Sequence, residues 1–456
     1  MVCKHKSIKN KYVLKTKLIL LVALLISIAT FSQKKWTLKE CVDEALKKNI
    51  SIQQNKLSLE LAKKDVEIAK GNFLPNLNAN TGGNLNFGTG FDPVSQNRIN
   101  TTFFGGSVNV SSGITVFNGY RNTNTFKQAQ LGVESGLLDL KKIENDISLF
   151  VVNGYLNILF AKENLNVAEV QYRISKTQIE AAQSRFNSGV IPKGDLLNTQ
   201  STAATNLQSV IEQENSLDLA LLNLAQLLQV NIAGFDISPI EVEAPSADLF
   251  YKNSSSVYDK SLQTMPEIAR AKLAIENAAL GIEITKASFL PTVTASLGLS
   301  TNYGFSLKLP DGFSNTPIID QFNENFGYGL GFNVSIPIFN RFQTKNRVAQ
   351  SVINKEIFET RLESEKLSLK QTIEQSFLDV KTALKSYEAA TISLEAQNEA
   401  FKNAQERYNF GVMTQFDFDQ VRTRLVNAEA TLIRSKYDYV FKTKVLQFYS
   451  GDLVLE

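Results

Sequence analysis

The hexapeptide 185-RFNSGV-190 recurs as 407-RYNFGV-412, and each copy is followed by an aspartate, Asp195 and Asp417. Each copy also closes a segment that opens on Phe-Asn, at residues 117–118 and 339–340. All matching positions lie 222 residues apart, so nothing is inserted between the opening and the closing motif. About 70 residues without a proline separate the two motifs in both copies. A fixed period of this kind indicates a structural duplication.

The segments between these motifs carry a seven-residue hydrophobic period. Its members are Val151, Ile158, Leu165, Tyr172, Ile179 and Phe186 in the first copy, and Ile373, Val380, Tyr387, Leu394, Phe401 and Tyr408 in the second. A companion row is mostly small: Gly154, Ala161, Ala168, Ser175 and Ala182, then Ser376, Ala383, Ala390, Gln397 and Ala404. A strict period of seven predicts helices that keep one seam against their neighbours. We predict two long helices, 118–188 and 340–410, each about 105 Å long at 1.5 Å per residue. The period alone is equally compatible with ordinary coiled-coil helices.

Residues 1–32 have the composition of a secretory signal peptide. Six lysines precede a short apolar core, 18–29, and small residues, Thr30 and Ser32, stand three and one positions before Gln33. A membrane-spanning helix needs about 20 apolar residues, more than this core supplies. We therefore predict export and cleavage before Gln33, with an uncleaved anchor as the alternative.

The predicted mature chain lacks the residues of most catalytic and metal sites. The net charge of +3 becomes −3 when the six lysines leave, so no basic patch for nucleic acid is expected. The only histidine, His5, lies in the signal peptide, and one cysteine, Cys41, remains after it. No intramolecular disulfide, no histidine-based catalysis and no His/Cys metal site can then form within one chain. No nucleophile–base pair and no phosphate-binding glycine loop is present either, so we predict no enzyme and no cofactor.

Two segments, 73–117 and 289–339, alternate in polarity with a period of two. The apolar series are Leu77, Ala79, Leu85 and Phe87; Phe104, Val108, Val110, Ile114 and Val116; Val293, Ala295, Leu297, Leu299 and Tyr303; Phe326, Tyr328, Leu330, Phe332, Val334 and Ile336. Asn, Ser, Thr and Gly fill the intervening positions, and both segments begin with Phe-Leu-Pro, at 73–75 and 289–291. This pattern predicts two β-hairpins, the first with a polar loop over 88–100.

Strands near ten residues long, with one polar face and aromatic residues near their ends, are typical of a transmembrane β-barrel. The alternative is a soluble hairpin with one wet face. Two such hairpins in an exported chain favour the membrane interpretation. Four strands cannot close a barrel, and an open sheet edge is not tolerated in lipid, so several chains must share one barrel.

The remaining segments complete two repeats, 33–261 and 262–456. In the first, a helix over 37–70 precedes hairpin 73–117, long helix 118–188 and return helix 193–232, and a mixed segment, 233–261, follows. In the second, a helix over 266–286 precedes hairpin 289–339, long helix 340–410, return helix 415–446 and a C-terminal segment. Each return helix is about half a long helix in length, so stacked pairs of half-length helices would match one long helix. We expect the mixed segments to form a belt around the middle of the helices.

This plan resembles the TolC-type outer-membrane efflux proteins over nearly the whole mature chain. The features that carry the resemblance are the duplicated helix–hairpin–helix order, the two Arg-aromatic-Asn-x-Gly-Val motifs and the Phe-Leu-Pro start of each hairpin. The resemblance implies an α+β membrane protein: a homotrimer whose 12-strand β-barrel in outer-membrane lipid continues into a long periplasmic α-helical barrel. It implies a passive outer-membrane duct of a tripartite efflux or type I secretion system. The implied partners are a periplasmic adaptor protein and, through it, an inner-membrane transporter.

The resemblance also assigns roles to the repeated motifs. The periplasmic turns would contact the adaptor through Arg185, Phe186, Gly189, Val190, Asp195, Arg407, Tyr408, Gly411, Val412 and Asp417. Tyr408 matches a tyrosine that links, in the family, to a neighbouring turn at a position corresponding to Asp195. Met413 stands where the family has an arginine of the closing network, and Gln420 stands where an aspartate ring narrows the pore. Asp417, Asp419 and Gln420 are therefore the candidate pore constriction.

Local chemistry offers a simpler reading of the same residues. Gly189 and Gly411 permit the positive φ of a sharp reversal, and Asp195 and Asp417 can cap the first amides of the return helices. At the level of the whole chain, the alternative function is an exported coiled-coil structural or adhesive protein of the cell surface. That alternative explains the helices but not the four alternating strands.

Overall fold

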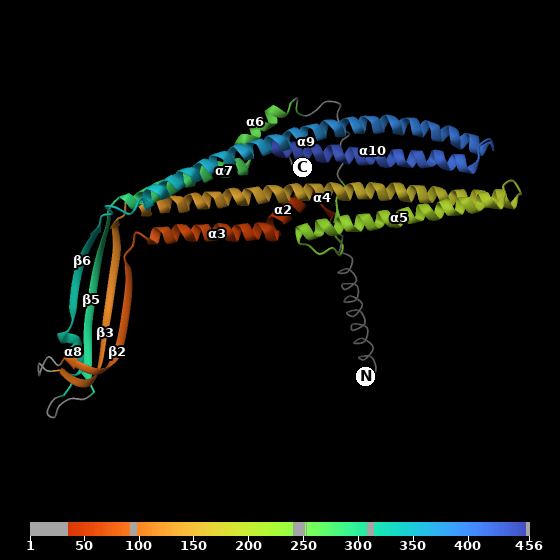
Figure 1. The fold of residues 1–456 in the computed structure, drawn as a ribbon. Coiled ribbons are helices and arrows are strands. Elements are labelled where there is room, and N and C mark those ends of the chain that lie inside the picture. The colour runs from red at the N-terminus through yellow and green to blue at the C-terminus, as the bar shows by residue number, and fades with distance from the viewer. Residues whose placement is uncertain (1–34, 92–97, 240–250, 252, 308–313, 453–456) are drawn as a thin grey trace, which may run out of the picture. The chain divides into compact units, whose positions relative to one another are not determined.

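The computed structural model describes residues 35–91, 98–239, 251, 253–307 and 314–452 (Figure 1). The chain forms two compact units, and each unit takes segments from both sequence repeats. The sheet unit comprises Gln54–Lys142 and Met265–Ser368, and the helical unit comprises the segment up to Gln53, Ile143–Thr264 and the segment from Leu369. The predicted signal peptide, 1–32, lies outside the described residues.

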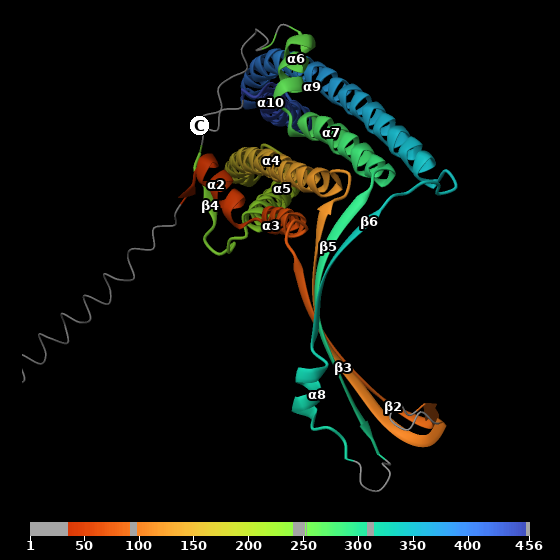
Figure 2. The ribbon, with the colours of Figure 1, turned by 90° about the vertical axis from the view of Figure 1, so that its left-hand side faces the viewer.

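The sheet unit contains one four-stranded antiparallel sheet of order β2-β3-β5-β6 (Figure 2). The strands are β2 (Asn76–Phe91), β3 (Arg98–Phe117), β5 (Thr292–Ser306) and β6 (Gly327–Ser335). The predicted polar loop over 88–100 is wrong at both ends, because β2 and β3 stay paired as far as Phe91↔Arg98. The added pairs include Gly88↔Thr101 and Thr89↔Asn100, so residues without an apolar pattern extend the ladder.

The register keeps the predicted alternation on one face of the sheet. Val110 pairs with Leu299 and Ala79, while Asn109 pairs with Ser300 and Asn80 on the opposite face. Among the described residues much of the apolar face is exposed to solvent: Leu77, Leu330 and Phe332 are 75%, 69% and 71% exposed. Four strands with a bare apolar face cannot be a finished soluble sheet, because each such side chain forgoes about 1.5–3 kcal/mol of burial.

Aromatic rings fill the places of glycines on the sheet. A Cβ on Gly106 would lie 2.3 Å from the Tyr303 ring, and one on Gly304 would lie 2.3 Å from the Phe103 ring. Phe104 and Tyr303 have ring centroids 6.0 Å apart on the apolar face. Glycine at these positions therefore lets large rings lie across the neighbouring strand.

Helical segments complete the sheet unit. They are the later part of α3 (Ile50–Gly71), the first part of α4 (Arg121–Asn187), α7 (Pro266–Lys286) and the first part of α9 (Gln343–Asn409). Asp139 on α4 accepts from Arg270 on α7 at 2.8 Å, and Gln128 donates to the Asn277 side chain at 2.8 Å. A short helix absent from our sequence prediction, α8 (Ile318–Glu324), lies in the β5–β6 connection.

The two long helices are continuous over 67 residues each, which corresponds to about 100 Å. The seven-residue period is buried most deeply where the helical unit begins: Val151, Ile158 and Ile373 are fully buried. The small companion row is buried as well, at Ala161, Ala168, Ser175, Ala182, Ala383, Ala390 and Ala404. Small side chains bring neighbours close, since a Cβ on Gly154 would lie 3.3 Å from Leu224 on α5 (Lys193–Leu228).

The predicted helix over 37–70 is wrong in one respect, because it breaks at Asn49. Thr37 and Glu40 form the predicted capping box of α2 (Leu38–Lys48). Asn49 then leaves the helical conformation at ψ 129°, and its side chain accepts from Ser51 and donates to the Leu227 carbonyl. Asparagine competes for local backbone groups in this way, which interrupts a helix that the apolar pattern alone would continue.

A small strand pair lies against the middle of α4. β1 (Lys35–Trp36) pairs in parallel with β4 (Asp236–Ile237). The Tyr155 hydroxyl donates within 2.6 Å of the Ser238 carbonyl, and Lys162 forms an ion pair with Asp236 at 2.5 Å. Tyr155 is fully buried, and burial raises the pKa of its phenol.

The return helices end differently from the sequence expectation. α5 stops at Leu228 rather than 232, and α10 (Gln415–Ser450) continues past 446 until Gly451 adopts a left-handed φ of +76°. Part of the segment predicted as mixed is helical, as α6 (Ser254–Thr264), and Ser261 on α6 donates to the Tyr449 carbonyl on α10. None of the described helices combines the length and the apolar character needed to cross a membrane.

Candidate functional site at the helical turns

The repeated hexapeptide forms the same backbone motif in both copies. In the first, the amide of Gly189 donates to Phe186 and that of Val190 donates to Arg185, both at 2.9 Å. This is the Schellman pattern that closes a helix with a left-handed residue, and Gly189 has φ +71°. The motif therefore corresponds to the last helical turn and the two residues that close it. Its arginine and its aromatic residue supply the carbonyls, and its glycine and valine supply the amides.

The second copy repeats this geometry. The Gly411 amide donates to Tyr408 at 3.0 Å, the Val412 amide donates to Arg407 at 2.9 Å, and Gly411 has φ +76°. Nothing lies within 4 Å of a Cβ built on either glycine. The predicted positive φ is confirmed, and it is the backbone conformation rather than crowding that requires glycine.

Neither aspartate is a helix cap, so the predicted capping role is wrong. The residue that precedes α5 is Pro192, which has no side-chain bond, and Asp195 lies within the first turn. Thr414 caps α10 by accepting from the Asp417 amide at 3.2 Å, and its hydroxyl donates to the Asp417 carboxylate at 2.7 Å. Both carboxylates nonetheless lie in a first turn, where the helix dipole favours negative charge.

The two turns of one chain contact each other through Arg185 and Tyr408. The guanidinium of Arg185 lies 5.3 Å from the centre of the Tyr408 ring. The same ring stacks on Phe418, with ring centroids 4.9 Å apart and an interplanar angle of 14°. Burial raises the pKa of Tyr408; Arg185 opposes this, while Asp419 and Asp195 add to it. Tyr408 and Asp195, which the resemblance links, are thus electrostatic neighbours within one chain.

A buried arginine near the turns was not predicted from the sequence. Arg422 is only 4% exposed, forms an ion pair with Asp419 at 3.0 Å and donates to the Gln178 side chain on α4. Burial lowers the pKa of Arg422, and Asp419 counteracts this. The repeat hides this contact, because Gln200 and Ala400 occupy the equivalent positions, 222 residues away. An i,i+3 charge pair, Asp419 and Arg422, is the only signal that the sequence offers.

The other predicted residues divide into exposed and partly covered sets. Val190 and Val412 are 63% and 66% exposed, and the neighbouring Phe410 and Phe416 reach 82% and 69%. Asp417 and Gln420 are exposed, Asp419 is engaged by Arg422 and Gln415, and Arg407 is exposed on the last turn of α9. Phe186 is half-buried. The turns of one chain therefore present a patch of apolar side chains bordered by carboxylates.

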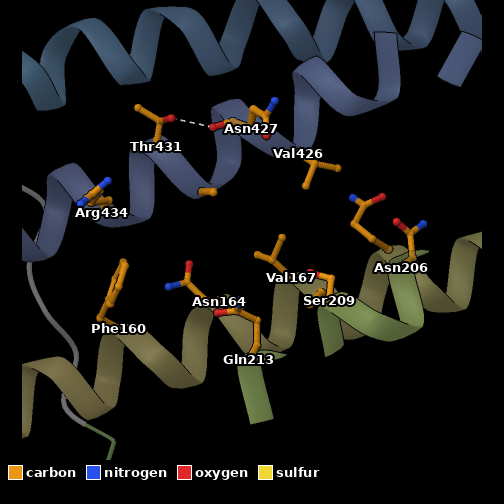
Figure 3. Close-up of a pocket in the computed structure, with 13 residues that line it drawn as sticks. Phe160, Asn164, Val167, Asn206, Ser209, Gln213, Val426, Asn427, Thr431 and Arg434 are labelled. Carbon is orange, nitrogen blue, oxygen red and sulfur yellow. Dashed lines mark hydrogen bonds between the residues drawn. The ribbon is translucent and has the colours of Figure 1, made fainter. Parts of the chain in front are cut away.

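Behind the turns, a polar hollow of about 510 Å³ lies among α4, α5 and α10 (Figure 3). Its lining is rich in amides and includes Asn164, Gln171, Asn206, Gln213 and Asn427, with Arg434 at one end. Gln171 is 8% exposed and its side chain bonds Glu429, while its side-chain oxygen, Oε1, has no hydrogen-bond partner among the described residues.

The described residues hold no cluster of three or more His, Cys, Asp or Glu side chains that could bind a metal ion. Cys41 is buried and is not part of a disulfide.

Comparison with known proteins identifies the family. Residues 41–229 and 257–451 match the profile of the outer membrane efflux proteins. The chain belongs to this family. It is 22% identical to the outer membrane protein TolC of Escherichia coli K12, over 91% of this chain and 82% of TolC. It is 23% identical to the alkaline protease secretion protein AprF of Pseudomonas aeruginosa, over 72% of this chain and 66% of AprF.

Solved structures share the fold at low identity. The Campylobacter jejuni outer membrane channel CmeC matches with a TM-score of 0.74 at 18% identity, covering 92% of this chain and 86% of CmeC. The Neisseria gonorrhoeae outer membrane channel MtrE matches with a TM-score of 0.69 at 17% identity, covering 92% and 90%. The predicted fold class is confirmed. This outer membrane efflux protein is an outer-membrane channel with a large periplasmic helical part, as efflux and type I secretion systems use.

Proposed function

We propose that three copies of this chain assemble into one duct, with a 12-strand barrel built from four strands of each copy. The observation that carries the proposal is the open sheet β2-β3-β5-β6, whose outer strands each have one partner and whose apolar face is bare. An open edge in hydrocarbon would leave backbone amides unsatisfied at several kcal/mol each, so the edges must be paired by neighbouring copies. Strand β6 of one copy would then pair with β2 of the next.

The same symmetry gives the periplasmic part of the duct. The repeats 33–261 and 262–456 each supply one long helix and a set of half-length helices, so three copies form a closed ring of helices. The amphipathic faces left exposed on α5, such as Leu207, Ile211 and Leu219, gain partners in that ring. Transport through it is passive, with no catalytic step and no cofactor. An inner-membrane transporter supplies the driving force.

The turns at 185–195 and 407–417 are the surface that contacts a periplasmic adaptor. The support is their composition: Val190, Val412, Phe410 and Phe416 are exposed around two rigid Schellman turns. Exposed apolar clusters of this kind mark protein–protein contacts. Rigid turns also present these side chains at little entropic cost on binding.

The contacts behind the turns hold the mouth of the duct closed. Arg185 with Tyr408 and Arg422 with Gln178 join the two helical hairpins of one chain near their ends. The hollow among α4, α5 and α10 provides room for the hairpins to separate. Asp417, Asp419 and Gln420 form the constriction, and the Asp419 charge is partly neutralised by Arg422, so Asp417 is the main cation-attracting group.

Planar bilayers test this function with the purified full-length chain. We expect stepwise conductance whose size or cation dependence changes in Asp417→Asn, because one exposed carboxylate is removed from the mouth. Absence of any conductance from protein that is correctly inserted would contradict a duct. The alternative, an exported adhesive coiled coil, predicts no conductance and does not account for the sheet.

A further inference from the structure

On the edge that faces β6, the part of strand β5 beyond Ser300 is hydrogen-bonded to side chains instead of to another strand. The β5–β6 ladder ends at Ser300↔Gly327, although β5 continues to Ser306. Beyond Ser300, amide side chains bond alternate β5 residues. Asn325 donates to the Asn302 carbonyl at 2.7 Å, and Gln321 accepts from the Gly304 amide at 2.7 Å and donates to its carbonyl at 3.0 Å. Asn315 repeats the Gln321 pattern on Ser306 at 2.9 and 3.0 Å.

These bonds fix helix α8 beside the sheet. Gln321, at the centre of α8, is 8% exposed, and the Thr301 hydroxyl donates to the Phe322 carbonyl at 3.1 Å. The Phe322 ring lies 5.5 Å from the Tyr303 ring at 86°. Tyr303 belongs to the apolar series of β5 that includes Leu297 and Leu299, so α8 contacts the apolar face of the sheet and not the polar one.

Helix α8 is amphipathic in spite of its seven residues. At 3.6 residues per turn, Ile318, Ile319 and Phe322 share one side, Asp320 and Glu324 share the opposite side, and Asn323 lies at the border next to Ile319. Phe322 orients the apolar side toward the sheet face. Ile319, on the same side, is nevertheless 69% exposed, and Phe326 and Tyr328, around the start of β6, are 56% and 80% exposed.

The position of α8 along the strands matches a membrane boundary. The ladder of β5 with β6 covers nine residues of β6, and nine residues tilted by about 40° rise about 23 Å. The apolar band of an outer-membrane barrel is about 25 Å tall and is bordered by aromatic residues. Phe104, Tyr303, Phe305 and Phe322 form a chain of ring contacts at this level, with centroids 5.5–6.4 Å apart.

We propose that α8 is an interfacial helix that rests on the acyl chains of the outer leaflet, with Ile319 inserted and Asp320 and Glu324 in water. The proposal rests on the placement of the sheet in the membrane. Continuity with the bare apolar face selects lipid as the occupant. A neighbouring copy would pair with the edge of the sheet and so lie in its plane. The apolar side of α8 lies instead toward the apolar face of the sheet, which is the face that would meet lipid. The helix thus replaces the outer part of β6 and anchors the rim of the duct in the membrane.

Quenching by brominated lipid tests the proposal on the full-length assembly. The single tryptophan, Trp36, is replaced by Phe, and one tryptophan is introduced by Ile319→Trp, Glu324→Trp or Leu330→Trp. Leu330 lies on the bare sheet face and is the membrane reference, and Glu324 is the control on the polar side of α8. Emission is compared in phosphatidylcholine vesicles with and without bromine on the acyl chains.

We expect Ile319→Trp to lose a fraction of its emission close to that lost by Leu330→Trp, while Glu324→Trp loses little. Quenching at Leu330→Trp without quenching at Ile319→Trp overturns the interfacial helix and leaves the membrane placement standing. It would assign the apolar side of α8 to a neighbouring copy or to water. Absence of quenching at Leu330→Trp overturns both. Ile318→Trp, on the same side of α8 and 40% exposed in the wild-type side chain, provides the same test if Ile319→Trp does not assemble.

Discussion

The Arg185 guanidinium of the first turn lies 5.3 Å from the centre of the Tyr408 ring of the second turn. The two copies of the repeated motif therefore meet through different residues: the first supplies a cation and the second an aromatic face. Phe186, which is equivalent to Tyr408, does not take this role. The duplicated sequence thus produces an asymmetric contact at the end of the helices, and the predictions for the mouth of the duct rest on it.

The first prediction concerns the glycines of the turns. Gly189→Val with Gly411→Val forces a β-branched residue to positive φ, which costs about 1–3 kcal/mol at each site. The assembly should remain heat-modifiable in the outer membrane, while efflux and cross-linking to the adaptor are lost. Gly194→Val is the matched control, since Gly194 lies in α5 with no positive φ and open space around it. Full efflux in the double variant would show that the turns only reverse the chain.

The second prediction separates the ring of Tyr408 from its hydroxyl. Arg185→Met removes an interaction worth about 0.5–1 kcal/mol and should raise the open probability in planar bilayers. Tyr408→Phe keeps the ring under Arg185 and over Phe418 and should behave as wild type. If Tyr408→Phe opens the duct as far as Arg185→Met does, a hydroxyl link holds the mouth and the cation–π contact does not.

The third prediction concerns the two faces of the sheet. Leu297→Lys or Val110→Lys places a charge on the apolar face and should cost about 2–4 kcal/mol per chain near mid-membrane. Asn80→Lys and Ser296→Lys lie on the polar face and should be tolerated. Heat-modifiability on gels reports assembly in each case. Equal losses on both faces would contradict the proposed orientation of the strands.

The fourth prediction is a pH dependence that arises at the polar hollow. Burial raises the pKa of Glu429, and its bond to Gln171 opposes this only in part. When the pKa of an acid is higher in the folded than in the unfolded state, its contribution to stability is complete below the pKa of the unfolded state. That contribution is lost as pH rises through the pKa of the folded state. Wild type should therefore lose more thermal stability than Glu429→Gln between mildly acidic and neutral pH. Parallel curves for the two proteins would exclude Glu429 as the cause.

Local patterns in the sequence predicted much of this fold, and non-local contacts account for most of what they missed. The heptad at Val151 and Ile373 and the alternation at Leu297 follow from periodicity, and the glycines followed from their backbone requirement. The break at Asn49 depends on a bond to Leu227, 178 residues away. Helix α8 is too short for a periodic signal, and Gln321 acts only because Gly304 lies beside it. The role of Arg422 could not be predicted, because its partner Gln178 lies on another helix.

The copy number of the purified assembly tests the central claim most directly. The full chain, extracted from the outer membrane in detergent, is measured by native mass spectrometry after cleavage of its predicted signal peptide. Four strands per chain and a shared barrel predict three copies of a 424-residue chain, with the β signal intact in circular dichroism. A stable monomer that retains the same β signal would contradict the shared barrel and, with it, the duct.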